Sequence, residues 1–366
     1  MRSLLLLASL SLAACSGGET KPPEAPKDKA ADNKGDTKPA EKGPPQELNV
    51  YIWTNYHSEA MVKKFEEKFN AKVTFDLYDN NEVIEQKLQS GAAYDIVVPS
   101  DYMIVSLTKQ GLLTELDESK LPNLSNIDPM LDWQKKDPSV KRTSVPYLWG
   151  TTAFAYRTDK GFPAPDSWAV FFDPKFKGHI NMLDDMREVF GAALRVDGKS
   201  VNTTDEAAML AAKKRLIKQK PLVLSYESSD FTGKIQSGDA WLSHGYSGEL
   251  ARAARESNGT IVYVVPKEGA SLYIDSMVIP KSAKHTDLAY EFINFMLDPD
   301  IAAETTNATG YATANANAKA KIKPELANDP AVFPSADIVA RCETIQDLGE
   351  MTPKWDEAWT EIKASE

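Results

Sequence analysis

Two acidic side chains three positions apart, Asp185 and Glu188, are candidates for ligand chemistry in this chain of 366 residues. They fall at the predicted start of a helix, where residues three apart share one face, so both carboxylates can point at one ligand. Carboxylates form charge-assisted hydrogen bonds with ammonium groups. The pair therefore favours a site for an organic cation, although two acids at this position also fit simple capping of a helix N-terminus.

Aromatic residues accompany acids in three further segments of the chain. These segments are Trp53-Thr54-Asn55-Tyr56, Ser100-Asp101-Tyr102 and Tyr273-Ile274-Asp275-Ser276. Aromatic faces cover methylene groups and attract cations, at ~0.5–2 kcal/mol per contact. Rings combined with carboxylates suit an alkyl-ammonium ligand, while a purely structural packing role for the same rings stays open.

A serine hydrolase is the competing interpretation, because Ser247 follows His244 by three residues. The run Gly245-Tyr246-Ser247-Gly248 does not match the G-x-S-x-G elbow, since its second glycine comes one residue early. The four histidines have no Cys or His partner at metal-ligand spacing. We therefore expect no enzyme, no cofactor and no metal site, and no phosphate-binding loop is present.

Strands and helices must position these segments, and they alternate along the chain. The N-terminal part predicts strands at 48–53, 72–77 and 95–99 and helices at about 61–69, 83–88 and 101–110. This alternation indicates an α/β domain with a mainly parallel sheet. Ligands bind beyond the carboxyl ends of such strands, where Trp53–Tyr56 and Ser100–Tyr102 are expected.

A second α/β region is predicted at about 152–266. Its expected strands are 179–183, 222–225, 240–244 and 261–265, and its expected helices begin near Asp185 and span 204–219. A strand at 271–280 and an amphipathic helix at 286–297 follow.

The N-terminal residues indicate an address outside the cytoplasm. Arg2 precedes an apolar run, Leu4–Leu12, that is too short to span a bilayer and ends in Leu12-Ala13-Ala14-Cys15. This end is similar to the lipobox of a bacterial lipoprotein, which implies a signal peptide at 1–14, cleavage before Cys15 and acylation of its thiol. Lipid chains would then hold the protein on a membrane face, in the periplasm or at the cell surface.

Residues 15–47 are expected to form a lipidated cysteine and a disordered tether. The segment from Ser16 has no aromatic or branched aliphatic residue and is rich in Pro, Lys, Glu and Asp, so it cannot bury enough apolar surface to order itself. The formal net charge of the chain is −11, which argues against nucleic acid as a partner. Beyond Cys15 the chain has one other cysteine, Cys342, so no disulfide within the mature chain is expected.

Several runs, in order, resemble those of the spermidine/putrescine-binding proteins of polyamine ABC transporters, along nearly the whole globular part. The runs are Tyr51-Ile52-Trp53-Thr54-Asn55-Tyr56, Tyr94-Asp95-Ile96-Val97-Val98-Pro99-Ser100, Pro146-Tyr147-Leu148-Trp149-Gly150, Asp184-Asp185-Met186-Arg187-Glu188-Val189-Phe190, Pro266-Lys267-Glu268-Gly269, Asp275-Ser276-Met277-Val278-Ile279-Pro280 and Gly310-Tyr311. The resemblance implies a type II periplasmic-binding-protein fold of two α/β lobes, with crossing hinge strands and a ligand cleft between them. Lobe one would be 48–150 plus 272–320, and lobe two 151–271 plus 321–366.

The resemblance also implies the ligand-binding residues. They would be Trp53, Thr54, Tyr56, Ser100, Tyr102, Asp185, Glu188, Ser228, Tyr246, Tyr273, Asp275 and Tyr311. Asp185 and Glu188 would hold one terminal amine, and Asp275 an inner or second amine. Arg187, between the first two acids, is expected to face away or to pair with a neighbour rather than to contact a cationic ligand.

Three departures from the family pattern leave the choice between putrescine and spermidine open. Tyr246 and Tyr273 stand where the family often has tryptophan, which makes the aromatic box smaller and more polar. The family's amide residue near the C-terminus aligns with either Ile345 or Gln346. Further acids, Glu227 and Asp101, lie beside expected contacts.

The implied function is a monomeric receptor that captures a polyamine and delivers it to membrane-embedded ABC permease subunits. Alternatives within the same fold are a receptor for an amino acid, a sugar or an anion, or a polyamine sensor. Stacked aromatics also suit sugars, whereas an anion would require converging arginines or backbone amides. The excess of acids at the strand ends favours a cation.

Overall fold

The computed structural model describes residues 43–134 and 141–365, and strands at both ends of this range belong to one sheet. The strands are β1 (Gln46–Trp53), β2 (Ala71–Tyr78), β3 (Ile96–Val97), β4 (Ser144–Arg157), β5 (Ile180–Met182), β6 (Val223–Tyr226), β7 (Leu242–Tyr246), β8 (Ile261–Val264), β9 (Ser271–Val278), β10 (Ala312–Thr313) and β11 (Glu343–Thr344). Their order is β2-β1-β3-β9-β4-β7-β5-β6, with β8 and β10 pairing with β4 and β11 pairing with β9.

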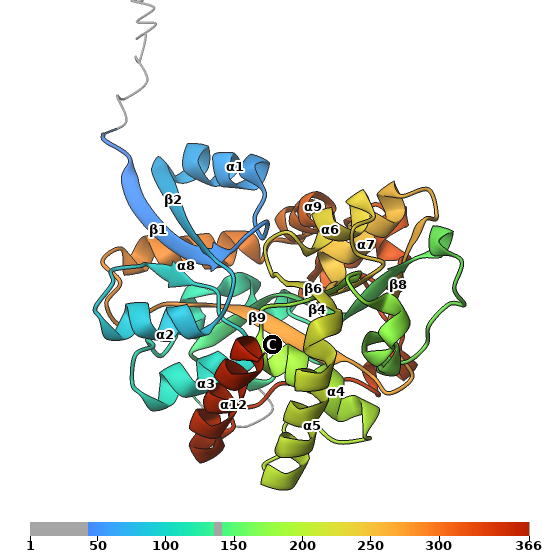
Figure 1. The fold of residues 1–366 in the computed structure, drawn as a ribbon. Helices are drawn as coiled ribbons and strands as arrows, with labels where there is room; N and C mark the ends of the chain where they lie inside the picture. Colours follow the sequence, from blue (N-terminus) through green and yellow to red (C-terminus); the bar gives the residue numbers. More distant parts are fainter. Residues whose placement is uncertain (1–42, 135–140, 366) are drawn as a thin grey trace, which may run out of the picture. The chain divides into compact units, whose positions relative to one another are not determined.

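The sheet contains two parallel sets of strands joined by an antiparallel pair. Strand β1 pairs in parallel with β2 and β3, and β5 pairs in parallel with β6 and β7. Between these sets, β4 pairs antiparallel with β9 along one part of its length and with β7 along the other. Figure 1 shows β4 and β9 running together through the middle of the ribbon. The predicted α/β class with crossing strands is confirmed.

Strand β4 is among the elements that the sequence pattern does not predict. Thirteen of its fourteen residues are buried, with Arg157 as the half-buried exception. Because both faces of the strand are covered, its sequence lacks the alternation of apolar and polar residues that marks a strand with one exposed face. Its connection of the two strand sets makes it central to the fold.

Helices connect the parallel strands of both sets and also make up much of the chain after β9. They are α1 (Glu59–Phe69), α2 (Glu82–Gln89), α3 (Asp101–Lys109), α4 (Met186–Val196), α5 (Glu206–Gln219), α6 (Phe231–Ser237), α7 (Ser247–Glu256), α8 (Thr286–Met296), α9 (Pro299–Thr309), α10 (Pro324–Ala327), α11 (Ala336–Val339) and α12 (Thr352–Ala364). The predicted strands and helices occur within a few residues of their expected limits, and β1 begins at Gln46 rather than at residue 48. Asn70 caps the C-terminus of helix α1, and its φ of 48° lies in the left-handed region that asparagine tolerates.

The apolar core is divided between the two strand sets. Val145, Leu148 and Trp149 of β4 pack into one cluster with Leu48 of β1, and Ala153, Phe154 and Tyr156 pack into another with Trp355 of α12. The crossing strand therefore contributes to both cores. The segment 322–333, which the predicted limits place in lobe two, packs with the first cluster. The lobe limits given above stay a prediction.

The predicted signal peptide, Cys15 and most of the predicted tether lie outside the described residues. Within 43–134 and 141–365, no helix is long and apolar enough to span a bilayer.

Candidate ligand-binding cavity

One cavity brings together all twelve predicted ligand-binding residues. Its volume is about 780 Å³, including open solvent at its mouth. Its lining also includes residues that were not predicted as contacts: Tyr78, Asp79, Asn81, Asp101, Ser229, Phe231, Glu249, Leu272 and Ile345. The predicted convergence of these segments is therefore found, while their contact with a ligand stays a prediction.

The ends of strands supply most of the lining. Trp53 is the last residue of β1, Tyr246 is the last residue of β7, and Ser100 precedes α3 directly after the strand region of β3. Asp185 follows β5 and immediately precedes α4. Since the carboxyl ends of parallel strands meet at one edge, two strand sets each deliver polar side chains to the same cavity.

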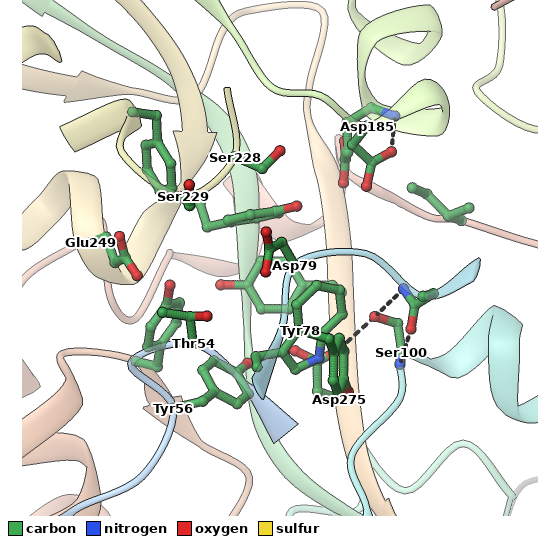
Figure 2. Close-up of a pocket in the computed structure, with 18 of the residues that line it drawn as sticks. Thr54, Tyr56, Tyr78, Asp79, Ser100, Asp185, Ser228, Ser229, Glu249 and Asp275 are labelled. Carbon is green, nitrogen blue, oxygen red and sulfur yellow. Dashed lines mark hydrogen bonds between the residues drawn. The ribbon is translucent and has the colours of Figure 1, made fainter. Parts of the chain in front are cut away.

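Asp185 both caps a helix and lines the cavity. Its Oδ1 accepts a 3.1 Å hydrogen bond from the backbone N–H of Glu188, drawn as a dashed line in Figure 2. The capping alternative is thus correct, and it does not exclude ligand binding, because an ionised carboxylate has about four acceptor sites on its two oxygens.

Asp275 of β9 is held in place by hydrogen bonds from residues that follow β1 and β3. Tyr56 donates to its Oδ2 and Ser100 donates to its Oδ1, both at 2.6 Å. Asn81 in turn donates to the Ser100 hydroxyl at 3.1 Å. Asp275 is only 4% exposed, and burial raises its pKa to about 7, although the two hydroxyl donors act in the opposite direction.

Glu188 and, in part, Asp185, at the start of α4, are also buried, and the charge of Asp185 acts on Glu188. Burial, followed by repulsion from Asp185, raises the pKa of Glu188 to about 7. Burial raises the pKa of Asp185 as well, against the effect of its hydrogen bond from Glu188 N–H. A bound cation would stabilise the ionised form of both carboxyl groups, which burial has deprived of water.

Aromatic rings form two connected walls of the cavity. Tyr246 lies 6.5 Å from Trp53 and 5.9 Å from Tyr273, measured between ring centroids, and Tyr56 lies 4.7 Å from Tyr311. The Tyr246 hydroxyl and the Trp53 Nε1 are buried and have no hydrogen-bond partner among the described residues. These rings can cover methylene groups, and the two polar atoms are available to a ligand.

Glu249 is the most informative residue that was not predicted. It lies in the first turn of α7, is 6% exposed, and accepts a long hydrogen bond of 3.3 Å from Asn55 Nδ2. Burial raises its pKa. The spacing of Tyr246 and Glu249 repeats that of Asp185 and Glu188 at a helix start, and this repetition is a signal the sequence contains.

Figure 2 shows that the acids are spread around the cavity. Glu249 and Asp185 lie at opposite sides of this view, Asp275 lies below, and Asp79 lies between them. Among the described residues, no three His, Cys, Asp or Glu side chains are grouped so that they could hold a metal ion.

Of the four residues whose place at the site the sequence left open, two line the cavity and two do not. Asp101 and Ile345 line the cavity, so Ile345 rather than Gln346 occupies the C-terminal position at the site. Glu227 is not in the lining; its carboxylate accepts from the backbone N–H and hydroxyl of Ser229 at 2.7 and 2.6 Å. Gln346 uses its backbone oxygen to accept from Arg187.

Arg187 is not in the described lining of the cavity and pairs with its neighbours, one of the two expected arrangements. Its guanidinium donates to the carbonyl oxygens of Gln346 and Val201 at 2.7 and 3.2 Å and lies 5.3 Å from the ring of Trp355. The described lining contains six carboxyl groups, those of Asp79, Asp101, Asp185, Glu188, Glu249 and Asp275, and no Lys, Arg or His. Its charge is therefore complementary to a cation.

The hydrolase alternative finds no support in the geometry. His244 is 0% exposed, packs edge-on against Trp168, and makes no hydrogen bond through either ring nitrogen among the described residues. Ser247 Oγ instead accepts from the backbone N–H of Thr151 at 3.2 Å. A base that does not contact the serine cannot activate it.

Comparison with known proteins places the chain among transport receptors. A family model described as bacterial extracellular solute-binding protein matches residues 60–334. The putrescine/cadaverine-binding protein of Pseudomonas aeruginosa is 38% identical over 333 residues, covering 87% of this chain and 94% of the relative. The spermidine/putrescine-binding periplasmic protein of Salmonella typhimurium is 36% identical over 320 residues, covering 87% and 91%. The crystal structure of the TpPotD lipoprotein of Treponema pallidum is 30% identical, with a TM-score of 0.77 and coverage of 87% and 99%.

Proposed function

Because the chain belongs to the bacterial extracellular solute-binding proteins, we propose that it captures a polyamine, putrescine or spermidine, and delivers it to the permease of an ABC transporter. The observation that carries this proposal is the cavity lined by six carboxyl groups and no basic side chain. An acidic cavity walled by tyrosine and tryptophan is complementary to a chain of methylene groups that carries ammonium groups. The named relatives support the same ligand class.

Each acid has a role in this proposal. Asp185 and Glu188 hold one terminal ammonium group from α4, and Asp275 holds an inner or second ammonium group from β9. Glu249, on the far side of the cavity from Asp185 in Figure 2, faces the other end of the ligand. Micromolar affinity requires about −8 kcal/mol, which a few charge-assisted bonds and ring contacts can supply after ordering costs.

Capture proceeds by closure of the two lobes on the ligand. Trp53, Tyr56 and Ser100 come from the strand set of β1, whereas Asp185 and Glu188 come from the set of β5. A ligand that contacts both groups binds the closed arrangement more tightly and so shifts the population towards it. Strands β4 and β9 connect the two parallel strand sets. In this proposal the two lobes close about these crossing strands.

The receptor works at a membrane surface in this proposal. Signal-peptide cleavage leaves Cys15 as the acylated N-terminus, and the residues between Cys15 and β1, which begins at Gln46, link the monomeric globular part to the membrane. The lipoprotein among the structural relatives supports the anchor. Metabolic labelling of the full chain with an alkyne fatty acid would attach label to the wild type, and Cys15→Ser would remove it.

A ligand panel tests the proposed function directly. The chain carrying Cys15→Ser, freed of carried-over ligand by unfolding and refolding, is heated with putrescine, spermidine, agmatine, maltose or glutamate. We expect a rise in melting temperature with the polyamines and none with maltose or glutamate. No change with millimolar polyamine would overturn the proposal, and a rise with maltose alone would reassign the ligand class.

A further inference from the structure

Asp275 faces no basic group in the described structure. The ionisable side chains whose charges act on it, or on which it acts, come from the loop after β1, from β2, from α3, from β7 and from β9 itself. They are Tyr56, Tyr78, Asp101, Tyr246 and Tyr273. None of these groups carries a positive charge, so an ionised Asp275 in the empty cavity has no counter-ion.

Hydrogen bonds to Asp275 compensate only in part for the missing counter-ion. Tyr56 and Ser100 occupy one oxygen each, and two neutral donors do not fill the roughly four acceptor sites of an ionised carboxylate that has lost its water. A proton on Asp275 removes the charge, and its O–H can donate to the Ser100 hydroxyl, which is able to accept. Burial places the pKa of Asp275 at about 7, where both forms are populated at neutral pH.

Glu188 differs from Asp275 in its charged neighbours, although burial raises the pKa of both to about 7. The Arg195 guanidinium on the same helix favours the ionised form of Glu188, and Asp185 opposes it. Asp185 accepts a backbone hydrogen bond, and Glu249 accepts from Asn55. Asp275 is 4% exposed, its hydrogen-bond donors are the two neutral hydroxyls of Tyr56 and Ser100, and no basic group is among the charges that act on it in the described structure.

We propose that binding of the polyamine displaces a proton from Asp275 to solvent, so that ligand capture is coupled to pH. The exchange is balanced: the protonated carboxyl group and an ammonium ion become a carboxylate–ammonium pair plus one proton released to the buffer. This inference deepens the proposed function and rests on it. Capture is strongest above the pKa of the empty site and weakens as the pH falls through about 7.

Titration calorimetry in matched buffers measures this proton directly. Spermidine is titrated into the Cys15→Ser chain at pH 7 in phosphate and in Tris, whose ionisation enthalpies differ. The difference in observed heat should correspond to release of about half a proton, as for a group near its midpoint. Affinity should fall by up to about 10-fold per pH unit as the pH is lowered from 7 to 5.

Point variants assign the proton to Asp275. Asp275→Asn should reduce the buffer-dependent heat while also weakening binding, and heat that remains in this variant but is lost in Glu188→Gln belongs to Glu188, whose pKa burial also raises to about 7. Asp287 is an exposed acid that pairs with Lys120 at 2.8 Å, so Asp287→Asn should leave the heat unchanged. Tyr56→Phe deletes one hydroxyl donor to the carboxylate, so it should shift the pH midpoint of binding upwards. A merely structural role of Tyr56 would lower affinity without moving that midpoint.

The outcomes separate this inference from the proposed function. Binding heat that is identical in both buffers would overturn proton coupling and leave polyamine capture intact. Buffer-dependent heat that is undiminished in Asp275→Asn would overturn the assignment to Asp275. Absence of any binding heat in either buffer would instead contradict the proposed function.

Discussion

The hydroxyl of Tyr56 donates a 2.6 Å hydrogen bond to Asp275, across 219 positions of the chain. The two residues lie on different elements, one after β1 and the other on the crossing strand β9. Tyr56 also contacts Tyr311 edge-on, with ring centroids 4.7 Å apart. An aromatic wall of the cavity is therefore connected directly to one of its acids.

Asp185→Asn should separate charge from capping. Asparagine is as good a helix N-cap as aspartate, so the melting temperature of the empty protein should stay near that of the wild type. Polyamine affinity should fall by 10-fold or more, about 1.4 kcal/mol, because the ammonium group loses a charged partner. Calorimetry and thermal unfolding on the same sample check both parts. Unchanged affinity would remove Asp185 from the binding site.

Glu249→Gln should weaken polyamine binding by about 10-fold if Glu249 faces the second end of the ligand, since the amide keeps the shape but not the charge. Glu256, which lies in the last turn of the same helix and is exposed, offers a matched control. Glu256→Gln should bind as the wild type does. Equal affinities for both variants would show that Glu249 makes no contribution to binding.

Gly248→Ala should disturb the aromatic wall without changing any charge. A Cβ at this position would meet the ring of Tyr311 in the absence of movement. Displacement of that ring also alters its contact with Tyr56, so we expect a lower melting temperature and affinity reduced several-fold, with overpacking costing about 1–3 kcal/mol. Gly43→Ala, where a Cβ meets nothing within 4 Å, is the control. A Gly248→Ala protein with wild-type binding and stability would contradict this packing.

His244→Phe should reduce the sensitivity of the fold to acid. Burial, followed by the charge of Arg195, lowers the pKa of His244 from 6.5 to about 3. Because the unfolded chain binds the proton more readily, stability is lost as the pH falls from about 6.5 towards 3. At pH 5 this single group costs about 2 kcal/mol.

Urea unfolding at pH 7 and pH 5 measures this contribution. The free energy of unfolding should drop less between the two pH values in His244→Phe than in the wild type, since phenylalanine keeps an aromatic ring against Trp168 and Phe171. Equal drops would mean that His244 does not titrate in this way.

The sequence by itself determined the local elements and the kind of ligand chemistry. Alternating apolar residues predict β1 and β2, and the acids beside tryptophan and tyrosine indicate an organic cation. The similarity of ordered runs then named twelve residues, and all of them line the cavity. These conclusions need only residue types, spacing and resemblance, which do not depend on knowing where distant segments meet.

Tertiary structure alone decided which undecided residues reach the cavity. Glu249 and Ile345 line it, whereas Arg187 and Gln346 contact each other outside it. Strand β4 escaped prediction because burial on both faces removes its polar alternation. The raised pKa of Asp275 follows from its burial, which is opposed by hydrogen bonds from Ser100 and from Tyr56, 219 positions away. Such properties depend on distances between segments that only folding brings together, and no local pattern contains them.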